Sequence, residues 1–134
     1  MKPLKKIIFT SSLAFITFIS LNSEAEISSW DCYKFEGAKI IADDGTYLGT
    51  LDDSWKTDSI YNDSGDHGND YNSESIWNDY SDYGNEYSSQ SAMNDSASEP
   101  PVLLKDGEVI GKLTTNDYEY EGVNPKVLKE VCDW

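Results

Sequence analysis

Aromatic side chains recur through residues 53–98, and their number suggests a ligand-binding surface. The faces of tryptophan and tyrosine rings suit the C–H surfaces of sugars, and these side chains also carry a polar group. The predicted ligand is a neutral glycan or a cell-wall polymer. The candidate platform consists of Trp55, Tyr61, Trp77, Tyr80, Tyr83 and Tyr87. The alternative is that these rings form the core of a domain that is poor in aliphatic residues, with their hydroxyls bonded to the backbone.

Acidic side chains in the same segment suggest calcium, which prefers oxygen ligands. The candidates are Asp63, Asp66, Asp70, Asp79, Asp82 and Glu86. An EF-hand loop needs oxygen ligands at its first, third and fifth positions and glycine at the sixth. Counted from Asp63, the third and fifth residues are Gly65 and His67, so the EF-hand pattern is absent. The other interpretation is that these acids are solvated surface groups.

The sequence offers little that is typical of an enzyme. His67 is the only histidine, and Tyr83 occupies the equivalent position sixteen residues later. No G-x-S-x-G motif, zinc-ligand pair or phosphate-binding loop is present. We therefore expect no catalytic residues, and no cofactor apart from calcium in the alternative above.

The aromatic residues belong to a tandem repeat of sixteen residues. Residues 59–74 read SIYNDSGDHGNDYNSE, residues 75–90 read SIWNDYSDYGNEYSSQ, and nine of the sixteen positions are identical. A third, eroded copy begins at Ser91. Each unit is too short to bury its own apolar face, so the units are expected to stack on one another and on a sheet. We expect a brief turn of helix after Ser59 and Ser75, followed by an extended piece.

The repeat resembles a family of small exported bacterial proteins. The residues that carry the resemblance are Ile76-Trp77-Asn78, Tyr80, Tyr83-Gly84, Tyr87-Ser88-Ser89, Ser91, Asn94 and Pro100-Pro101, followed by an Asp-Gly hairpin. The resemblance covers residues 59–123. It implies export, but it assigns no site residue because the family has no established active site.

Two matching segments flank the repeats and predict β-hairpins. Residues 38–51 and 102–113 each contain two apolar runs around an Asp-Gly pair, which tolerates the positive φ angles of a tight turn. Gly49 and Gly111 occupy the same position in the two segments and predict a bulge or a close backbone approach. Tyr118 and Tyr120 alternate with acids in a possible fifth strand, and Asn124-Pro125 predicts a helix over residues 125–131. The predicted fold class is a small, mainly antiparallel α+β domain with four to five strands, the repeat insert and a short C-terminal helix.

The N-terminus indicates export, and the charge of the mature domain limits its partners. Three lysines precede an apolar run over residues 7–21, which is typical of a secretory signal peptide cleaved after Ala25. The mature domain, residues 26–134 with internal repeats over 53–98, keeps seven lysines and 24 acids and has no arginine. Its net charge of −17 disfavours nucleic acid and anionic membranes, and favours solubility or a cationic protein partner. A secreted or periplasmic location predicts a disulfide between Cys32 and Cys132. The expected role is non-enzymatic binding or envelope structure.

Overall fold

A computed structural model describes residues 26–134, so the predicted signal peptide over residues 1–25 lies outside the described residues. The fold is α+β, as predicted. Its sheet has five strands in the order β2-β1-β3-β4-β5. Their bounds are β1 (Lys39–Ile41), β2 (Tyr47–Thr50), β3 (Val102–Lys105), β4 (Glu108–Leu113) and β5 (Gly122–Val123). Within residues 26–134, no helix is long and apolar enough to cross a membrane.

The central part of the sheet is formed by two antiparallel pairs that lie side by side. β1 pairs with β2, β3 pairs with β4, and β1 also pairs with β3 in antiparallel register. Asp106 and Gly107, both at positive φ, lie between β3 and β4. Register shifts occur opposite both Gly49 and Gly111, where the sequence predicted a bulge or close approach. The sheet is therefore mostly antiparallel, and only β5 runs parallel to its neighbour β4.

The predicted strand around Tyr118 and Tyr120 is wrong. These residues lie in turns, and their side chains are 85% and 79% exposed. The side chain of Asn116 accepts a hydrogen bond from the backbone N–H of Tyr118 and favours a turn at this point. Glu121 then adopts a positive φ of 58°, and the chain joins the sheet only at β5.

Two helices are joined by the predicted disulfide. α2 (Ser29–Phe35) begins with a capping box between Ser28 and Asp31. α3 (Pro125–Cys132) begins where the sequence predicts, because the side chain of Asn124 accepts hydrogen bonds from the backbone of Lys126 and Val127. The Cys32–Cys132 bond, which confirms the prediction, links the two helices with a Cα–Cα distance of 5.6 Å.

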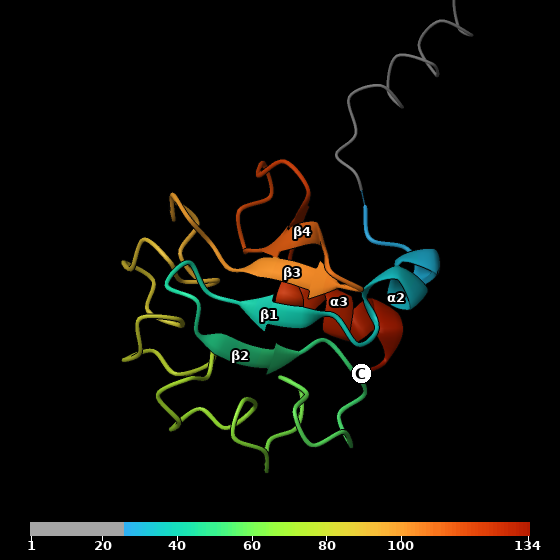
Figure 1. Cartoon of the computed structure of the whole chain (residues 1–134), viewed down its shortest axis with the longest axis horizontal. Coiled ribbons are helices and arrows are strands. Elements are labelled where there is room, and N and C mark those ends of the chain that lie inside the picture. The colour runs from blue at the N-terminus through green and yellow to red at the C-terminus, as the bar shows by residue number, and fades with distance from the viewer. Residues whose placement is uncertain (1–25) are drawn as a thin grey trace, which may run out of the picture.

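The sheet, α3 and the repeats share one core. Figure 1 shows α3 behind the strands, while residues 53–98 pass around the edge of the sheet next to β2. Fully buried aliphatic side chains come from all three parts: Ile40, Leu48, Leu103, Leu113, Leu128, Ile60 and Ile76. The repeats are thus part of the domain core.

Candidate functional site

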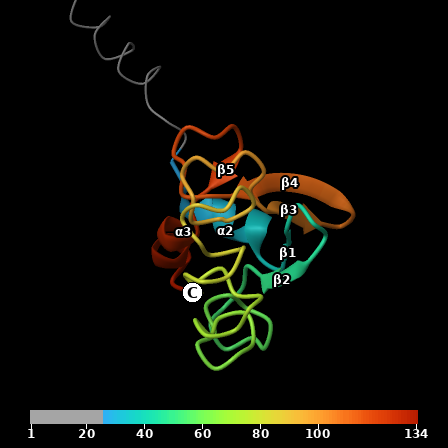
Figure 2. The same cartoon turned by 90° about the vertical axis from the view of Figure 1, so that its left-hand side faces the viewer.

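Residues 53–98 wind into a stacked coil. Figure 2 shows their successive loops one above another beside α3. The coil contains turns and bends, with a single isolated bridge between Thr50 and Ser59 and no helix, so the expected turn of helix after Ser59 and Ser75 is wrong. Serine and asparagine side chains bond to the nearby backbone here, and such bonds compete with helix formation.

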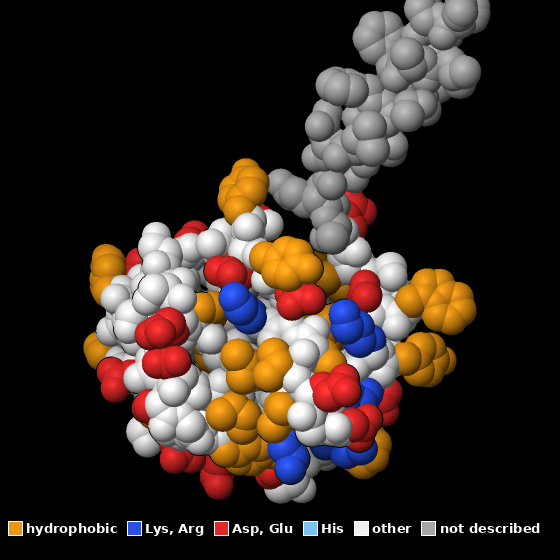
Figure 3. Space-filling view, turned by 45° about the horizontal axis from the view of Figure 1, so that its top comes forward, with side chains coloured by type: hydrophobic (Ala, Val, Ile, Leu, Met, Phe, Trp, Pro, Cys, Tyr) orange, Lys and Arg blue, Asp and Glu red, His pale blue; other side chains and the backbone are white. Residues whose placement is uncertain are grey.

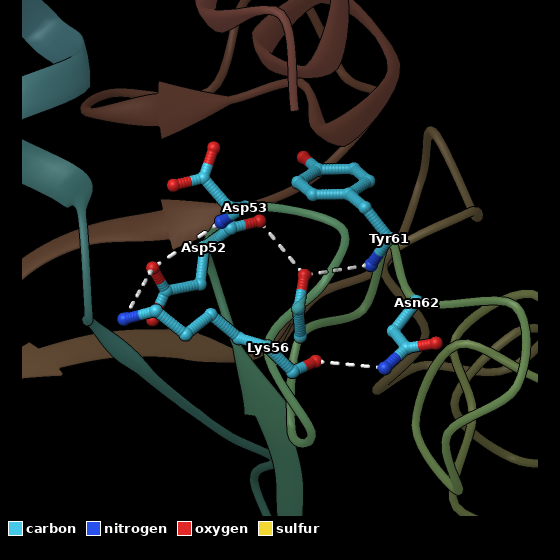
Figure 4. Close-up of polar contacts among 6 residues, drawn as sticks. Asp52, Asp53, Lys56, Tyr61 and Asn62 are labelled. Atoms are coloured by element: carbon cyan, nitrogen blue, oxygen red, sulfur yellow. Dashed lines mark hydrogen bonds and ion pairs between the residues drawn. The ribbon is translucent and has the colours of Figure 1, made fainter.

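The same hydrogen bonds recur every sixteen residues. In each coil an asparagine amide donates to the carbonyl six residues earlier, at 2.9, 3.0 and 2.8 Å for Asn62, Asn78 and Asn94. A fully buried serine hydroxyl also accepts from the backbone N–H two residues later, at Ser59, Ser75 and Ser91. Figure 4 shows the first coil, where Asn62 reaches Lys56. These bonds explain why serine and asparagine keep their places in all three copies.

The candidate aromatic residues fall into three groups, and the first is buried. Tyr61 is only 4% exposed, belongs to the core and packs between the rings of Trp77 and Trp134, at 6.3 and 6.1 Å. Its hydroxyl donates a hydrogen bond of 2.7 Å to the carbonyl oxygen of Pro125. For Tyr61 the core alternative therefore holds, and the residue fixes the start of α3 against the coil.

Replacing Tyr61 with phenylalanine is expected to lower the free energy of unfolding by about 1 kcal/mol at neutral pH, because the Pro125 carbonyl loses its donor. Burial raises the pKa of Tyr61 above its usual value. The folded state therefore keeps the phenol proton to a higher pH than the unfolded state does. The contribution of Tyr61 to the free energy of unfolding is complete below pH ~10, where both states are neutral, and falls as the pH rises further. Denaturation from pH 7 to 11.5 should show a smaller alkaline loss in Tyr61→Phe. Tyr118→Phe, at an exposed site, should match the parent, and a parent-like alkaline loss in Tyr61→Phe would contradict this role.

The second group is half-buried and held in place by polar contacts. The indole Nε1 of Trp77 donates to the carbonyl oxygen of Ile60 at 2.6 Å, across two adjacent coils. The hydroxyl of Tyr83 donates to Asp44 at 2.8 Å and ties the coil to the turn between β1 and β2. Hydrogen bonds from Thr46, and then from Tyr83, lower the pKa of Asp44. Trp77 and Tyr83 both pack against the core and keep part of their surface accessible.

The third group points into solvent. Trp55 is 73% exposed, Tyr80 94% and Tyr87 84%. Tyr71, which the candidate set omitted, is 89% exposed and lies sixteen residues from both Trp55 and Tyr87. Each coil thus exposes an aromatic side chain at the same repeat position.

Two grooves lie on the coil beside α3, and their walls are related by the repeat. The first groove is about 580 Å³ and the second about 510 Å³. From the coil, the first is lined by Ile60, Tyr61, Asp63, Gly68, Asp70 and Trp77. Sixteen residues later, the corresponding positions line the second: Ile76, Trp77, Asp79, Gly84, Glu86 and Met93. Trp77 therefore belongs to both grooves, and Lys126 at the start of α3 also lines both.

A third groove of about 570 Å³ continues the series. It shares Glu86, Tyr87, Met93 and Asp95 with the second groove. Tyr80 and Tyr87 line the second groove together with Trp77. The second groove therefore combines three of the candidate aromatic side chains with carboxylates and an ammonium group. Trp55 and Tyr83 line none of the three grooves.

The six candidate calcium ligands are exposed and dispersed. Asp63 and Asp70 line the first groove, Asp79 and Glu86 line the second, and Asp66 and Asp82 line neither. Among residues 26–134 no group of three or more acidic, histidine or cysteine side chains is arranged to hold a metal ion. Figure 3 shows acidic side chains spread over one face of the molecule, with several hydrophobic side chains standing out from its outline.

His67 packs at the edge of the sheet. The residue is 8% exposed, and its ring meets that of Tyr47 edge-on at 5.1 Å between centroids. Its Nδ1 atom is buried without a hydrogen-bond partner. His67 lines none of the three grooves, so it acts as a packing residue beside Gly49.

Several groove residues were absent from the sequence-based candidates, and three of them have side chains that can contact a ligand through an ammonium or thioether group. Lys126 and Lys129 come from α3, and Met93 comes from the eroded third copy. The repeat alignment of Met93 with Trp77 was a usable signal for one of them. Nothing local in the sequence indicated that α3 would pack beside the coil. Comparison with known proteins gives no match to this chain among family models, curated proteins or solved structures.

Proposed function

We propose that this protein is an exported, non-enzymatic binding module whose coil binds a neutral glycan of the cell envelope. The second groove carries the proposal, because Trp77, Tyr80 and Tyr87 surround a hollow of about 510 Å³ that also contains Asp79, Glu86 and Lys126. Aromatic faces can cover the C–H surfaces of a sugar. The carboxylates accept hydrogen bonds from hydroxyls, and the ammonium group donates them.

Hydrogen bonds within the wall of the second groove support binding. Trp77 is held by its hydrogen bond to Ile60, and the backbone N–H of Tyr80 is held by the side chain of Asn78 at 2.9 Å. A wall that is ordered before the ligand arrives loses less conformational entropy on binding. Tyr80 and Tyr87 are also so exposed that they add little to the core, which makes a role in recognition the better explanation for them.

The exposure of the groove acids argues for binding rather than hydrolysis. A hydrolase encloses its catalytic carboxyl groups in a site from which water is largely excluded. Asp79 and Glu86 are exposed in the second groove. The disulfide between Cys32 and Cys132 supports the exported location, because such bonds persist in oxidising compartments.

Replacing Tyr87 with alanine is expected to weaken binding to the polysaccharide about 5- to 30-fold, because the aromatic contact contributes about 1–2 kcal/mol to the binding free energy. Co-sedimentation with chitin, cellulose and peptidoglycan would measure it. Tyr118→Ala is the matched control, because Tyr118 is equally exposed and lines none of the grooves. Absence of retention on all three polymers, or equal losses in the two variants, would contradict the proposal.

A cationic protein partner is the second candidate function. Residues 57–98 contain nine acids and no lysine or arginine, so their field attracts a basic surface. Such an association should weaken as salt rises from 50 to 500 mM, whereas binding of a neutral glycan should change little.

Calcium binding is the weaker alternative, since the candidate acids are dispersed, and it requires a melting temperature that rises with calcium and falls with chelator.

A further inference from the structure

The three grooves are neighbours along the coil, and together they are called the furrow. The first and second share Trp77 and Lys126 as common walls. The second and third share Tyr87 and Met93. Each groove therefore borders the next through common side chains, and a ligand longer than one groove can contact the lining of its neighbour.

Successive grooves also offer similar chemistry. Tyr61, Trp77 and Met93 occupy one repeat position along the furrow, while Asp63, Asp79 and Asp95 occupy another. In both sets, each groove is lined by the residue that lies sixteen positions after the one in the preceding groove. The ring centroids of Tyr61 and Trp77, which occupy equivalent positions in adjacent coils, lie 6.3 Å apart. A surface that repeats its chemistry at this step fits a ligand that repeats its own structure.

We propose that the furrow binds consecutive units of one linear, neutral glycan chain, with the chain running across the coils. This inference rests on the proposed glycan-binding function and adds the form of the ligand. Trp77 contacts the units on either side of the first boundary, and Tyr87 does so at the second. Carboxylates on the coil accept hydrogen bonds from the hydroxyls, and the ammonium groups of Lys126 and Lys129 on α3 donate to them.

The number of occupied grooves should set the affinity. Each additional unit of a bound chain binds as part of the same molecule, so its contacts strengthen binding without a second association cost. Affinity is therefore expected to rise at least tenfold between one unit and three, and then to level off once the furrow is filled. A ligand confined to one groove would show no such rise.

Isothermal titration calorimetry with β-1,4-linked N-acetylglucosamine and glucose oligomers of one to six units tests this directly. Two variants probe separate parts of the furrow: Asp70→Ala in the first groove and Tyr87→Ala at the second boundary. Both side chains are exposed, so the fold should be retained, and Tyr118→Ala serves as control. Both furrow variants should weaken the hexamer, about threefold and tenfold, and the control should not.

Several results would overturn the inference. Equal affinity for one unit and six, or a hexamer that is weakened by only one furrow variant, means that a single groove binds the ligand. The proposed function would survive that result if the protein were still retained on an insoluble polysaccharide. If no oligomer binds, the linear-chain inference is wrong, and if no polysaccharide retains the protein either, both proposals fail.

Discussion

Removal of the Cys32–Cys132 bond by replacing both residues with alanine should lower the free energy of unfolding by about 2–5 kcal/mol. The two cysteines are 100 residues apart, so the bond closes a loop that includes almost the whole described domain. In the chain-entropy model a loop of this size gives about 4.7 kcal/mol, because the open unfolded chain has many more conformations than the closed one. For a domain of this length the change is a large fraction of the total stability.

Urea denaturation of the parent and of the double variant measures this effect. The parent treated with a reducing agent is the internal control and should unfold at the same urea concentration as the double variant. The variant itself should not respond to reduction. A difference below about 1 kcal/mol between parent and variant would show that α2 and α3 remain associated in the unfolded ensemble without the bond.

Replacing Gly49 with alanine should destabilise the domain by about 3 kcal/mol or more. Gly49 has a φ of 105°, and a Cβ at this position would lie 2.6 Å from the carbonyl oxygen of Asp58 and 2.7 Å from the Cβ of His67. The backbone N–H of Thr50 donates to the same carbonyl of Asp58, which joins β2 to the first coil. The added methyl therefore combines backbone strain with a clash at the contact between sheet and coil.

Gly45→Ala separates these two causes. Gly45 also has a positive φ, 89°, but a Cβ there meets no atom within 4 Å. Its replacement should cost only the strain of a left-handed alanine, about 1–2 kcal/mol. Thermal or chemical denaturation of both variants gives the comparison. Equal losses would mean that the coil does not approach Gly49 closely.

Local signals account for the parts of the fold that were predicted. The N-cap at Asn124 and the proline after it need only neighbouring residues, so the start of α3 was correct. The cysteine pairing followed from two cysteines in a predicted exported chain. The strand expected around Tyr118 was wrong because it was predicted only from the alternation of tyrosine and acidic residues. That pattern contains no information on the Asx turn made by Asn116.

The candidate site was predicted only in part. The repeat identified every aromatic side chain that lines the grooves, yet it could not separate Tyr61, which is buried, from Tyr87, which is exposed. Lys126 entered the site without any sequence signal, because its place depends on α3 packing beside a coil that lies far away in the chain.

By itself, the sequence determined the α+β class, the sixteen-residue period and the start of α3, since capping and repetition act over short distances. The tertiary structure alone decided which face of each coil is buried. Tyr61 lies inside because Trp77, Trp134 and the carbonyl of Pro125 surround it, whereas no such partners surround Tyr87. Burial depends on what packs against a residue, and for these repeats the packing partners come from distant parts of the chain.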